Sequence, residues 1–598
     1  MYGLMFSVPL TMSCPRGTVT AALIGARSAE KLDDSMAAGG LELTAADVKK
    51  IANSVDRTGA RTGTTMPHFS ACVKAEVIRQ SLSFGRIWLA ASGSDQNAHK
   101  RDVFSVCTTL GSPRPLRGRD NCLRTVKENP MCAFESMFRS RILKLGVEVL
   151  TVLAVMMCAG AFAQQQIVLT NVIVIDGTGR PAQRNRTVVI KGDRIQSIAA
   201  GQEHAPSSAK VIDLQGQTIM PLIINAHGHL GLTKGTTQSA ANQTDDNFRH
   251  QLLRYQEYGV GAVLSMGTDG KRFAEIREES RRGDLRGADV YTAGIGFGAK
   301  NGVPPAAMGF TEVFRPDTPA EARSQVAQQA PQKPDFIKVW VDDFWGQYPK
   351  LPPEIYGAII DEAHKHSLRV AAHVYHLQDA RLLVADGVDV LAHSIRDADV
   401  DNALIAEMKN HHVAYIPTLS LDDFAFAYGD SPKWVGDPFF SAALDPGVLE
   451  MITSPEYKTK VQSNKVTAQE QAALPEAMHN LKKIYDAGIL VSLGTDSGAT
   501  PIRTQGFAEH MELALMVQAG LTPLQAITVA TLNAAKLLHI SDQYGTLAAG
   551  KKANFIVLEK DPSQDIHNTQ TIRAVWKDGN KVSDGPLAAA TSAVLRGF

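Results

Sequence analysis

The sequence predicts an α/β protein built around a closed (β/α)8 barrel of the TIM type, with a small β-sandwich domain made from both ends of the mature chain. Three observations support this prediction. Apolar, strand-like runs alternate with helical patterns through the middle of the chain. Short segments rich in β-branched residues flank that region on both sides. Histidine, lysine and aspartate, which bind metals or move protons, recur at the ends of the central runs.

The composition is typical of a soluble globular protein. The 598 residues include 61 lysines and arginines and 61 aspartates and glutamates, and 44% of the residues are hydrophobic. This length has room for two or three domains, and the balanced charge creates no strong field toward nucleic acid or an anionic membrane. We therefore expect no nucleic-acid partner, and we leave open whether the chain forms a homo-oligomer.

Residues 137–163 have the organisation of a secretory signal peptide. A basic stretch after Met137 leads into an apolar run and then into a small-x-small motif at 161–163. Because signal peptides are N-terminal, we predict that residues 1–136 are a spurious or disordered extension. A membrane anchor is the alternative, but the run is short for a span and contains Glu148. We expect an exported protein, periplasmic or secreted, with no stable membrane span after processing.

The mature chain begins and ends with short antiparallel strands. Runs rich in β-branched residues lie at 166–176, 187–198, 553–558 and 572–582. Neither pair of runs is large enough to bury a core alone. We therefore predict that residues 164–218 and 545–590 join into one β-sandwich domain, with the catalytic domain inserted between them.

The inserted region, residues 219–544, carries the predicted barrel. Its strand-like runs lie at 219–230, 260–266, 289–294, 335–341, 368–374, 389–394, 414–419 and 489–496. Helical patterns separate them, as in 353–366, where the apolar residues recur on one face, and in 378–385. Barrel enzymes place their chemistry at the C-terminal ends of the strands, so the residues there can be judged as a set.

Side chains suited to metal chemistry occupy these strands and their ends. The set consists of His227, His229, Lys338, His373, His393 and Asp496. The first two are one residue apart in a strand, so both imidazoles face the same side and reach one cation. Each has a structural alternative: a histidine can be a bonded core residue, Asp496 can cap a turn, and Lys338 can pair with Asp342. Together they predict a metal site at the barrel mouth.

Read in order, these motifs resemble the metal-dependent amidohydrolase superfamily. The resemblance rests on Pro221-Leu-Ile-Ile-Asn-Ala-His-Gly-His, Ala372-His373, Ala392-His393, Gly494-Thr-Asp496-Ser and a tail from Ala519-Gly-Leu-Thr-Pro to Lys551-Lys-Ala-Asn-Phe-Ile-Val-Leu. The segment around Lys338 is similar to the prolidase-like and imidazolonepropionase-like branch, whose binuclear members carboxylate this lysine. Asn225 stands where the family usually has aspartate, a departure that touches packing and not a ligand.

The resemblance implies two Zn²⁺ ions bridged by a carboxylated Lys338. One metal would take His227, His229, Asp496 and the carbamate, and the other would take His373, His393 and the same carbamate. Neutral imidazoles and a carboxylate suit Zn²⁺, and a desolvated lysine can lose its proton and react with CO₂. A metal-activated hydroxide would attack a polarised carbonyl, with Asp496 passing the proton to the leaving nitrogen. Asp496 and Lys338 are thus the predicted catalytic residues.

We accordingly predict a metal-dependent hydrolase that cleaves a C–N bond of a small-molecule substrate. The bond belongs to an amide, a cyclic amide, an N-acyl amino acid or a dipeptide. The alternative is a mononuclear deaminase or an imidazolone-type hydrolase, in which Lys338 is merely structural. A non-catalytic binding barrel is a third hypothesis, and the intact ligand set argues against it.

The sequence says less about the substrate. Side chains near the predicted rim that suit a substrate carboxylate or an oxyanion are Tyr375, His376, Arg396, Arg503 and His510, and no spacing rule selects among them. The segment 422–470 is long for a barrel loop and rich in aromatic residues. It either covers the site as a lid or packs on the barrel.

Overall fold

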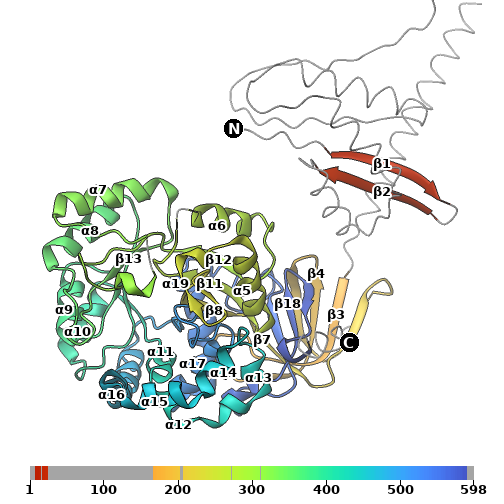
Figure 1. The fold of residues 1–598 in the computed structure, drawn as a ribbon. Coiled ribbons are helices and arrows are strands. Elements are labelled where there is room, and N and C mark those ends of the chain that lie inside the picture. The colour runs from red at the N-terminus through yellow and green to blue at the C-terminus, as the bar shows by residue number, and fades with distance from the viewer. Residues whose placement is uncertain are drawn as a thin grey trace, which may run out of the picture. The chain divides into compact units, whose positions relative to one another are not determined.

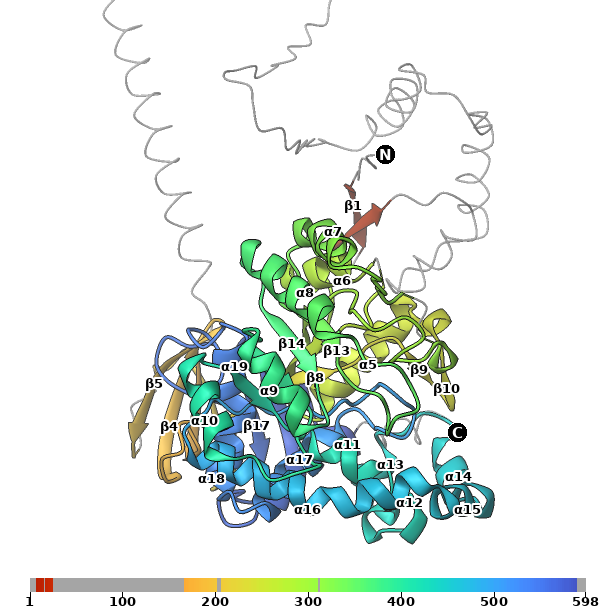
Figure 2. The same cartoon turned by 90° about the vertical axis from the view of Figure 1, so that its left-hand side faces the viewer.

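The computed structural model describes residues 7–14, 17–24, 166–201, 206–270, 272–309 and 312–588 (Figures 1 and 2). The chain divides into two compact units, Met1–Lys127 and Glu128–Phe598. In the first, β1 (Ser7–Cys14) and β2 (Gly17–Ile24) form an antiparallel hairpin in which Ser7 lies opposite Ile24. The predicted signal peptide at 137–163 lies outside the described residues.

Both ends of the second unit contribute to one mixed sheet. Its strands are β3 (Gln166–Val174), β4 (Gln183–Lys191), β5 (Arg194–Ala200), β6 (Lys210–Asp213), β7 (Thr218–Pro221), β17 (Phe555–Leu558), β18 (Ile572–Lys577) and β19 (Asn580–Ser583). The order is β19-β18-β17-β7-β3-β4-β5, with β6 paired to β3. The antiparallel pair of β7 and β17 joins the two ends of the chain. Phe555 of β17 stacks on Trp576 of β18, with ring centroids 5.5 Å apart. The predicted joining of the terminal segments is therefore observed.

Parallel strands form the centre of the molecule. Three pair in the order β12 (Asp289–Thr292), β11 (Val260–Ser265), β8 (Ile223–Gly228), and four in the order β13 (Ile337–Trp340), β14 (Val370–His373), β15 (Val390–Ala392), β16 (Ala414–Ile416). Isolated parallel bridges connect Phe297 with Val339, Tyr415 with Val491 and Gly228 with Ser497. The run predicted at 489–496 thus contacts β16 on one side and β8 on the other. Among them, β8, β11, β13 and β14 are buried on both faces, as is typical of strands in a parallel sheet.

The run predicted as one strand at 219–230 is two strands. β7 pairs with β17 of the mixed sheet, whereas β8 pairs with β11 of the parallel sheet. The change of partner falls at Leu222, whose N–H donates to Asn554, while the N–H of Ile223 donates to Gly259. Both strands are fully buried, so the alternation of polar and apolar residues that would have revealed the break is absent.

Helices cover the parallel strands (Figures 1 and 2). They are α5 (Asp245–Glu257), α6 (Phe273–Arg281), α7 (Pro319–Gln329), α8 (Pro353–Lys365), α9 (Leu377–Ala385), α10 (Asn402–Asn410), α17 (Phe507–Gln518), α18 (Pro523–Thr528) and α19 (Ala534–Leu537). α8 and α9 match the helices predicted at 353–366 and 378–385. Proline at the first position of α8 starts it, and its apolar face is buried.

A second group of helices lies between β16 and the run at 489–496. They are α11 (Leu419–Phe424), α12 (Ala427–Asp430), α13 (Pro438–Ser441), α14 (Val448–Thr453), α15 (Pro455–Ser463) and α16 (Lys465–Asp486). The segment predicted as a long loop at 422–470 is therefore helical. None of the helices in the described ranges combines the length and apolarity that a membrane crossing needs.

Candidate metal centre

His227, His229 and Asp496 meet at the end of β8. The two histidines lie on the same side of the chain, with ring centroids 5.7 Å apart. Oδ1 of Asp496 lies 2.8 Å from Nε2 of His229 and 3.3 Å from Nε2 of His227. The backbone fixes this arrangement, because the N–H of Asp496 donates to the carbonyl of His227 at 2.8 Å. Backbone hydrogen bonds between β8 and the run at 489–496 therefore bring together residues that lie some 270 positions apart in the sequence.

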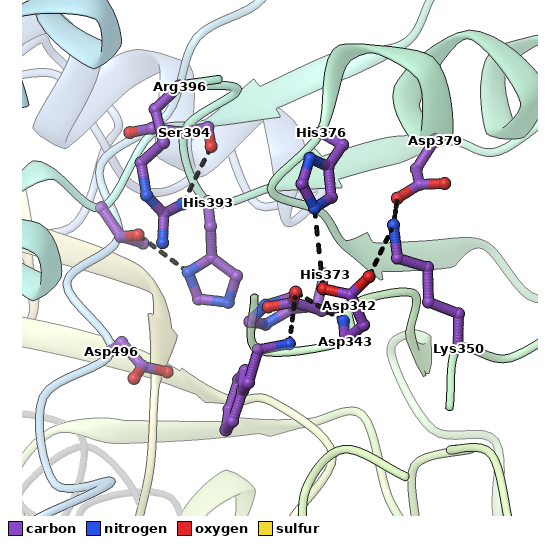
Figure 3. A network of polar contacts seen from close by, with 12 residues as sticks. Asp342, Asp343, Lys350, His373, His376, Asp379, His393, Ser394, Arg396 and Asp496 are labelled. Carbon is purple, nitrogen blue, oxygen red and sulfur yellow. Dashed lines mark hydrogen bonds and ion pairs between the residues drawn. The ribbon is translucent and has the colours of Figure 1, made fainter. Parts of the chain in front are cut away.

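His373 and His393 complete the cluster from β14 and the residue after β15 (Figure 3). Their ring centroids are 4.2 Å apart, and the ring of His393 lies 4.5 Å from that of His227. One ligand atom from each of His227, His393 and Asp496 lies within 4.8 Å of the other two. The residues predicted to bind metal at the strand ends therefore form one buried cluster.

Hydrogen bonds orient three of these imidazoles. Nδ1 of His229 lies 2.7 Å from Oγ1 of Thr268, and Nδ1 of His393 lies 2.8 Å from Oγ1 of Thr418. Nε2 of His373 lies 2.7 Å from Oδ2 of Asp342. Such bonds fix the tautomer and leave the opposite ring nitrogen for a metal. The sequence analysis did not identify Thr268 and Thr418, which lie shortly after the ends of β11 and β16.

Two of the six residues have an unusual backbone. His393 has a φ of 75° and Asp496 a φ of 55°, which is the left-handed region that favours glycine. Residues other than glycine that are held there cost about 1–3 kcal/mol each and cluster at functional sites. The strained backbone at His393 and Asp496 therefore directs these two side chains toward the candidate centre.

Lys338 lies in the middle of β13 and is completely buried. Its Nζ has no hydrogen-bond partner among the described residues. Burial lowers the pKa of Lys338 to about 7, although the Asp496 carboxylate opposes that shift. Gly267 leaves room for this side chain, since a Cβ there would lie 2.5 Å from Cγ of Lys338. The amine is thus available in its neutral, nucleophilic form near neutral pH.

The alternative ion pair between Lys338 and Asp342 does not form. Both oxygens of Asp342 are engaged elsewhere: Oδ2 with His373, and Oδ1 with the N–H groups of Asp343 and Phe344 at 2.7 and 3.1 Å. The spacing of four residues puts both side chains on one face of an ideal strand, but β13 ends at Trp340, so Asp342 lies beyond the regular strand. Asp342 therefore supports a histidine and not the lysine.

The protonation states suit a cation site. Burial, followed by repulsion from Lys338, holds the pKa of His227 well below its usual value, and burial likewise lowers the pKa values of His373 and His393. Burial alone would raise the pKa of Asp496, but Arg503, His229 and His227 outweigh it and hold that pKa well below its usual range. His227, His373 and His393 are therefore neutral imidazoles near an ionised Asp496 carboxylate, and such donors fit a divalent metal.

A buried network beneath the centre locks β8 to the run at 489–497. The carboxylate of Glu509, on α17, accepts hydrogen bonds from Asn225 at 2.6 Å and from Thr495 and Ser497 at 2.8 Å each. Asn225 in turn accepts the N–H of His227 at 2.9 Å. An asparagine can donate to Glu509, whereas an ionised aspartate would repel it. This pairing explains the asparagine that departs from the family pattern.

The predicted rim residues differ in their surroundings. Arg503 forms an ion pair with Oδ2 of Asp496 and so contacts the centre directly. Arg396 stacks on Tyr375 at 4.3 Å from the ring centroid, but its charge is taken up by the buried carboxylates of Glu470 and Asp422 at 3.0 and 3.3 Å. It therefore anchors the helical segment to the strands.

His376 lies beside the acidic pair that follows β13. Its Nδ1 is 3.0 Å from Asp397 and its Nε2 is 3.7 Å from Asp343. With Asp342 and Asp343 it forms a second group of possible ligand atoms within 4.8 Å, which the sequence reasoning did not identify. His376 therefore stays near the centre without contacting the residues predicted to bind metal.

His510 is not at the rim, so its prediction as a substrate-binding residue was wrong. It is buried on α17, with Nε2 2.9 Å from the carbonyl of Tyr258 and Nδ1 3.0 Å from Oγ1 of Thr569. Both ring nitrogens are thus occupied inside the protein. A histidine in an amphipathic helix gives no sequence signal that separates this role from binding.

Burial lowers the pKa of His510 to about 4, so this residue should make stability depend on pH. In the unfolded chain this histidine binds a proton below about pH 6.5, whereas in the folded protein it does so only below about pH 4. The unfolded state therefore binds more protons between these values, and the free energy of unfolding falls as the pH falls from 6.5 to 4. The loss reaches about 3 kcal/mol at most. We expect His510→Gln to show a shallower fall than the unmodified protein in urea unfolding between pH 7 and 4.5. Parallel curves for the two proteins would contradict this assignment.

The aromatic segment 422–470 packs on the strands. Phe424, Tyr428, Phe439 and Phe440 are buried in the same core as the parallel strands. Trp434 lies at 4.8 Å from Phe440 and 5.2 Å from Phe507 of α17, measured between ring centroids. Of the two roles left open by the sequence, these contacts favour packing over a mobile lid.

Phe440→Ala should therefore destabilise the fold without emptying the metal centre. Removing a fully buried phenylalanine costs about 3–5 kcal/mol in transfer and cavity terms. Phe426→Ala, at a partly buried position of the same segment, is the matched control and should cost less. Urea unfolding and metal analysis measure the two effects. Unchanged stability with an altered KM would restore the lid hypothesis.

Comparison with known proteins adds to this geometry. Residues 218–582, more than half of the chain, match the amidohydrolase family. Imidazolonepropionase of Deinococcus deserti is 36% identical over 107 residues, which are 17% of this chain and 26% of that protein. Ochratoxinase of Aspergillus niger is 24% identical over 475 residues, covering 69% of this chain and 86% of that protein.

The fold has counterparts among solved structures. A Xaa-Pro dipeptidase with bound methionine in its active site superposes with a TM-score of 0.57 at 23% sequence identity, covering 70% of this chain and 99% of that one. At this identity the likeness concerns the fold alone. The family match, together with the buried cluster of histidine and aspartate, shows that this chain belongs to the amidohydrolase family and is a metal-dependent hydrolase.

Proposed function

We propose that the protein hydrolyses a C–N bond of a small amide with a binuclear metal centre. The observation that carries this proposal is Lys338, a buried lysine whose Nζ has no hydrogen-bond partner among the described residues and which lies close enough to His227, His373 and His393 to lower their pKa values. An unpartnered ammonium at such a position costs several kcal/mol. Conversion to a carbamate removes that cost, because the lysine then becomes an anion that two cations neutralise.

The residues present fit two divalent metals, which we take to be Zn²⁺. His227, His229 and Asp496 would hold one, and His373 and His393 the other, with Lys338 between them. The carbamate forms when the neutral Lys338 amine bonds to the carbon of CO₂ and releases one proton. The orientation of three imidazoles, those of His229, His373 and His393, by Thr268, Asp342 and Thr418 supports this assignment.

Divalent metals at these positions supply a Lewis acid that polarises the substrate carbonyl and lowers the pKa of water. Asp496 is the group that moves the proton. Its carboxylate stays ionised beside Arg503 and His229, so it can accept the proton of the attacking water. It then returns that proton to the leaving nitrogen, which departs as a neutral amine.

The relatives narrow the substrate to small molecules with a C–N bond. A Xaa-Pro dipeptidase by its name cleaves an amide between two amino acids, and imidazolonepropionase by its name involves a cyclic amide. We therefore infer that N-acyl amino acids, dipeptides or cyclic amides are the substrates. The local likeness to imidazolonepropionase is the reason to keep a second candidate, an imidazolone-type hydrolase, for which we propose one metal and no carbamate on Lys338.

Metal analysis and an amide panel test these alternatives together. We expect two equivalents of metal per chain and release of a primary or secondary amine from at least one N-acyl amino acid or dipeptide. Chelation should abolish turnover, and Zn²⁺ should restore it. One equivalent with release of ammonia, or with opening of an imidazolone ring, would favour the mononuclear alternative. No hydrolysis by the metal-loaded protein would overturn the proposal.

We also propose that the two parallel sheets and the run at 489–497 form a closed (β/α)8 barrel, with the mixed sheet as a sandwich-like domain. The bridges from that run to β16 and to β8 support closure. The pattern at 137–163 supports export to the periplasm or the medium, with the mature chain beginning near Gln164. Intact-mass measurement of protein from the native host tests this start. Peptides from residues 1–130 in the exported product would contradict it.

A further inference from the structure

A cluster of aromatic side chains follows β13, the strand that carries Lys338. Phe344 lies 6.0 Å from Trp345 and 6.0 Å from Tyr348, measured between ring centroids. Trp345 is in turn 5.8 Å from Tyr375, which comes two residues after His373. We call these four residues the aromatic rim. They connect the ends of two neighbouring strands.

The aromatic rim differs from the aromatic cluster of segment 422–470. In segment 422–470, Phe424, Tyr428 and Phe440 are at most 1% exposed and belong to the core. By contrast, Phe344, Trp345 and Tyr348 are only half-buried. Large aromatic faces that stay partly open beside a reaction centre are more useful for binding than for stability. The rim therefore presents surface that the fold does not need for packing.

The backbone of the rim is strained. Phe344 and Trp345 are consecutive residues with φ values of 46° and 59°, in the left-handed region that bulky side chains rarely adopt. Such conformations persist where the surroundings force them, and they cluster at sites of binding and catalysis. Two in succession on half-open aromatic residues indicate that the position of these rings matters.

Polar contacts on both sides hold this turn in place. Asp342 accepts the N–H of Phe344 at 3.1 Å, and Asp343 accepts the N–H of Gly346 at 2.9 Å. Lys350 closes the turn through Asp343 at 3.3 Å and Asp379 at 2.7 Å (Figure 3). The rings are therefore preorganised, which lowers the entropy lost when a ligand binds.

The same turn touches the metal centre. Asp342 bonds Phe344 through Oδ1 and His373 through Oδ2, the latter at 2.7 Å (Figure 3). The rim thus begins one side chain away from a residue predicted to bind metal. Arg396 fixes its far end by stacking on Tyr375. A substrate whose carbonyl reached the metals would have its neighbouring substituent beside these rings.

We propose that the aromatic rim is a substrate subsite for a flat ring, so that the preferred substrates are amides that carry an aromatic group next to the scissile bond. This proposal rests on the hydrolase function proposed above. Aromatic rings prefer offset-stacked or edge-to-face contacts with one another, and a saturated ring of similar area lacks that geometry. The rim therefore favours a planar ring over a puckered one of the same size.

Matched substrate pairs test this preference. One pair is N-benzoylglycine and N-cyclohexanecarbonylglycine, and the other is N-acetylphenylalanine and N-acetylcyclohexylalanine. We expect the metal-loaded enzyme to prefer the flat member of at least one pair by about tenfold in kcat/KM, mainly through KM. Trp345→Leu keeps apolar volume but removes the flat face, so it should lose this preference. Trp345→Phe should retain most of it.

The controls separate this inference from the proposed function. Trp434→Phe alters the packed aromatic segment and should leave the preference unchanged. Hydrolysis of both members at equal kcat/KM, or a preference that survives Trp345→Leu, would overturn the aromatic subsite and leave the hydrolase intact. If no amide is hydrolysed, the proposed function is wrong. The aromatic subsite is then tested by measuring the affinity of the protein for the same pairs by calorimetry. Equal affinity for flat and puckered rings would then overturn it.

Discussion

Replacing Lys338 with alanine should remove one of the two metals and nearly all turnover. If a carbamate bridges the centre, the variant loses the anion shared by both cations, and His373 and His393 alone are too few to hold a metal. We expect about one equivalent of metal per chain and a fall in kcat of roughly 10³-fold or more, since metal catalysis supplies several kcal/mol. Metal analysis at matched folding by circular dichroism measures the first effect, and initial rates measure the second.

Lys338→Met is the control for the volume of the side chain. Methionine fills the space beside Gly267 without an amine, so this variant should fold at least as stably as the parent and still lack the second metal. Short carboxylic acids with bicarbonate should partly restore metal and turnover in Lys338→Ala, because they supply the missing anion. Retention of two full equivalents by either variant would end the bridging hypothesis.

Replacing Asp496 with asparagine should be as damaging as the loss of Lys338, for a different reason. The amide keeps the shape but can neither accept the proton of water nor neutralise a metal. General acid–base catalysis contributes about 10²–10⁴-fold, so we expect kcat to fall by at least about 10³-fold when the lost ligand is included. Weaker metal retention on dialysis should accompany it. Rates within tenfold of the parent would exclude Asp496 as the proton carrier.

Arg503→Gln tests whether Arg503 keeps the Asp496 carboxylate ionised. Removing the guanidinium takes away the largest influence that keeps the pKa of Asp496 low, so that pKa should rise. Activity that depends on the carboxylate is lost as the pH falls through its pKa. The acid limb of kcat/KM should therefore move to higher pH in Arg503→Gln, while activity at alkaline pH changes less. An unmoved acid limb would contradict this coupling.

The order of strands and their ligands could be predicted because both are local patterns. Each buried strand is a short apolar run, and the four histidines predicted as ligands lie at or beside the end of one, as with His373 in β14 and His393 after β15. The apolar face of α8 likewise follows from the spacing of its residues. Burial selects these residue types directly, so the sequence records them.

Other features depend on which segments become neighbours. The break between β7 and β8 at Leu222 leaves no mark in the sequence, because both sheets bury both faces of the strand. An even spacing predicts Asp342 beside Lys338, but Asp342 lies beyond the end of β13 and hydrogen-bonds to His373. His510 was expected at the rim, yet its helix faces Tyr258 and Thr569.

By itself, the sequence predicted which side chains come together at the candidate metal centre, since strand periodicity and burial act over a few neighbouring residues. Only the tertiary structure decided how those residues are held. Three contacts between separate segments hold them: Asn225 hydrogen-bonds to Glu509, Thr268 hydrogen-bonds to His229, and Arg503 forms an ion pair with Asp496. Hydrogen bonds and ion pairs depend on distances of about 3 Å, which only the folded chain fixes.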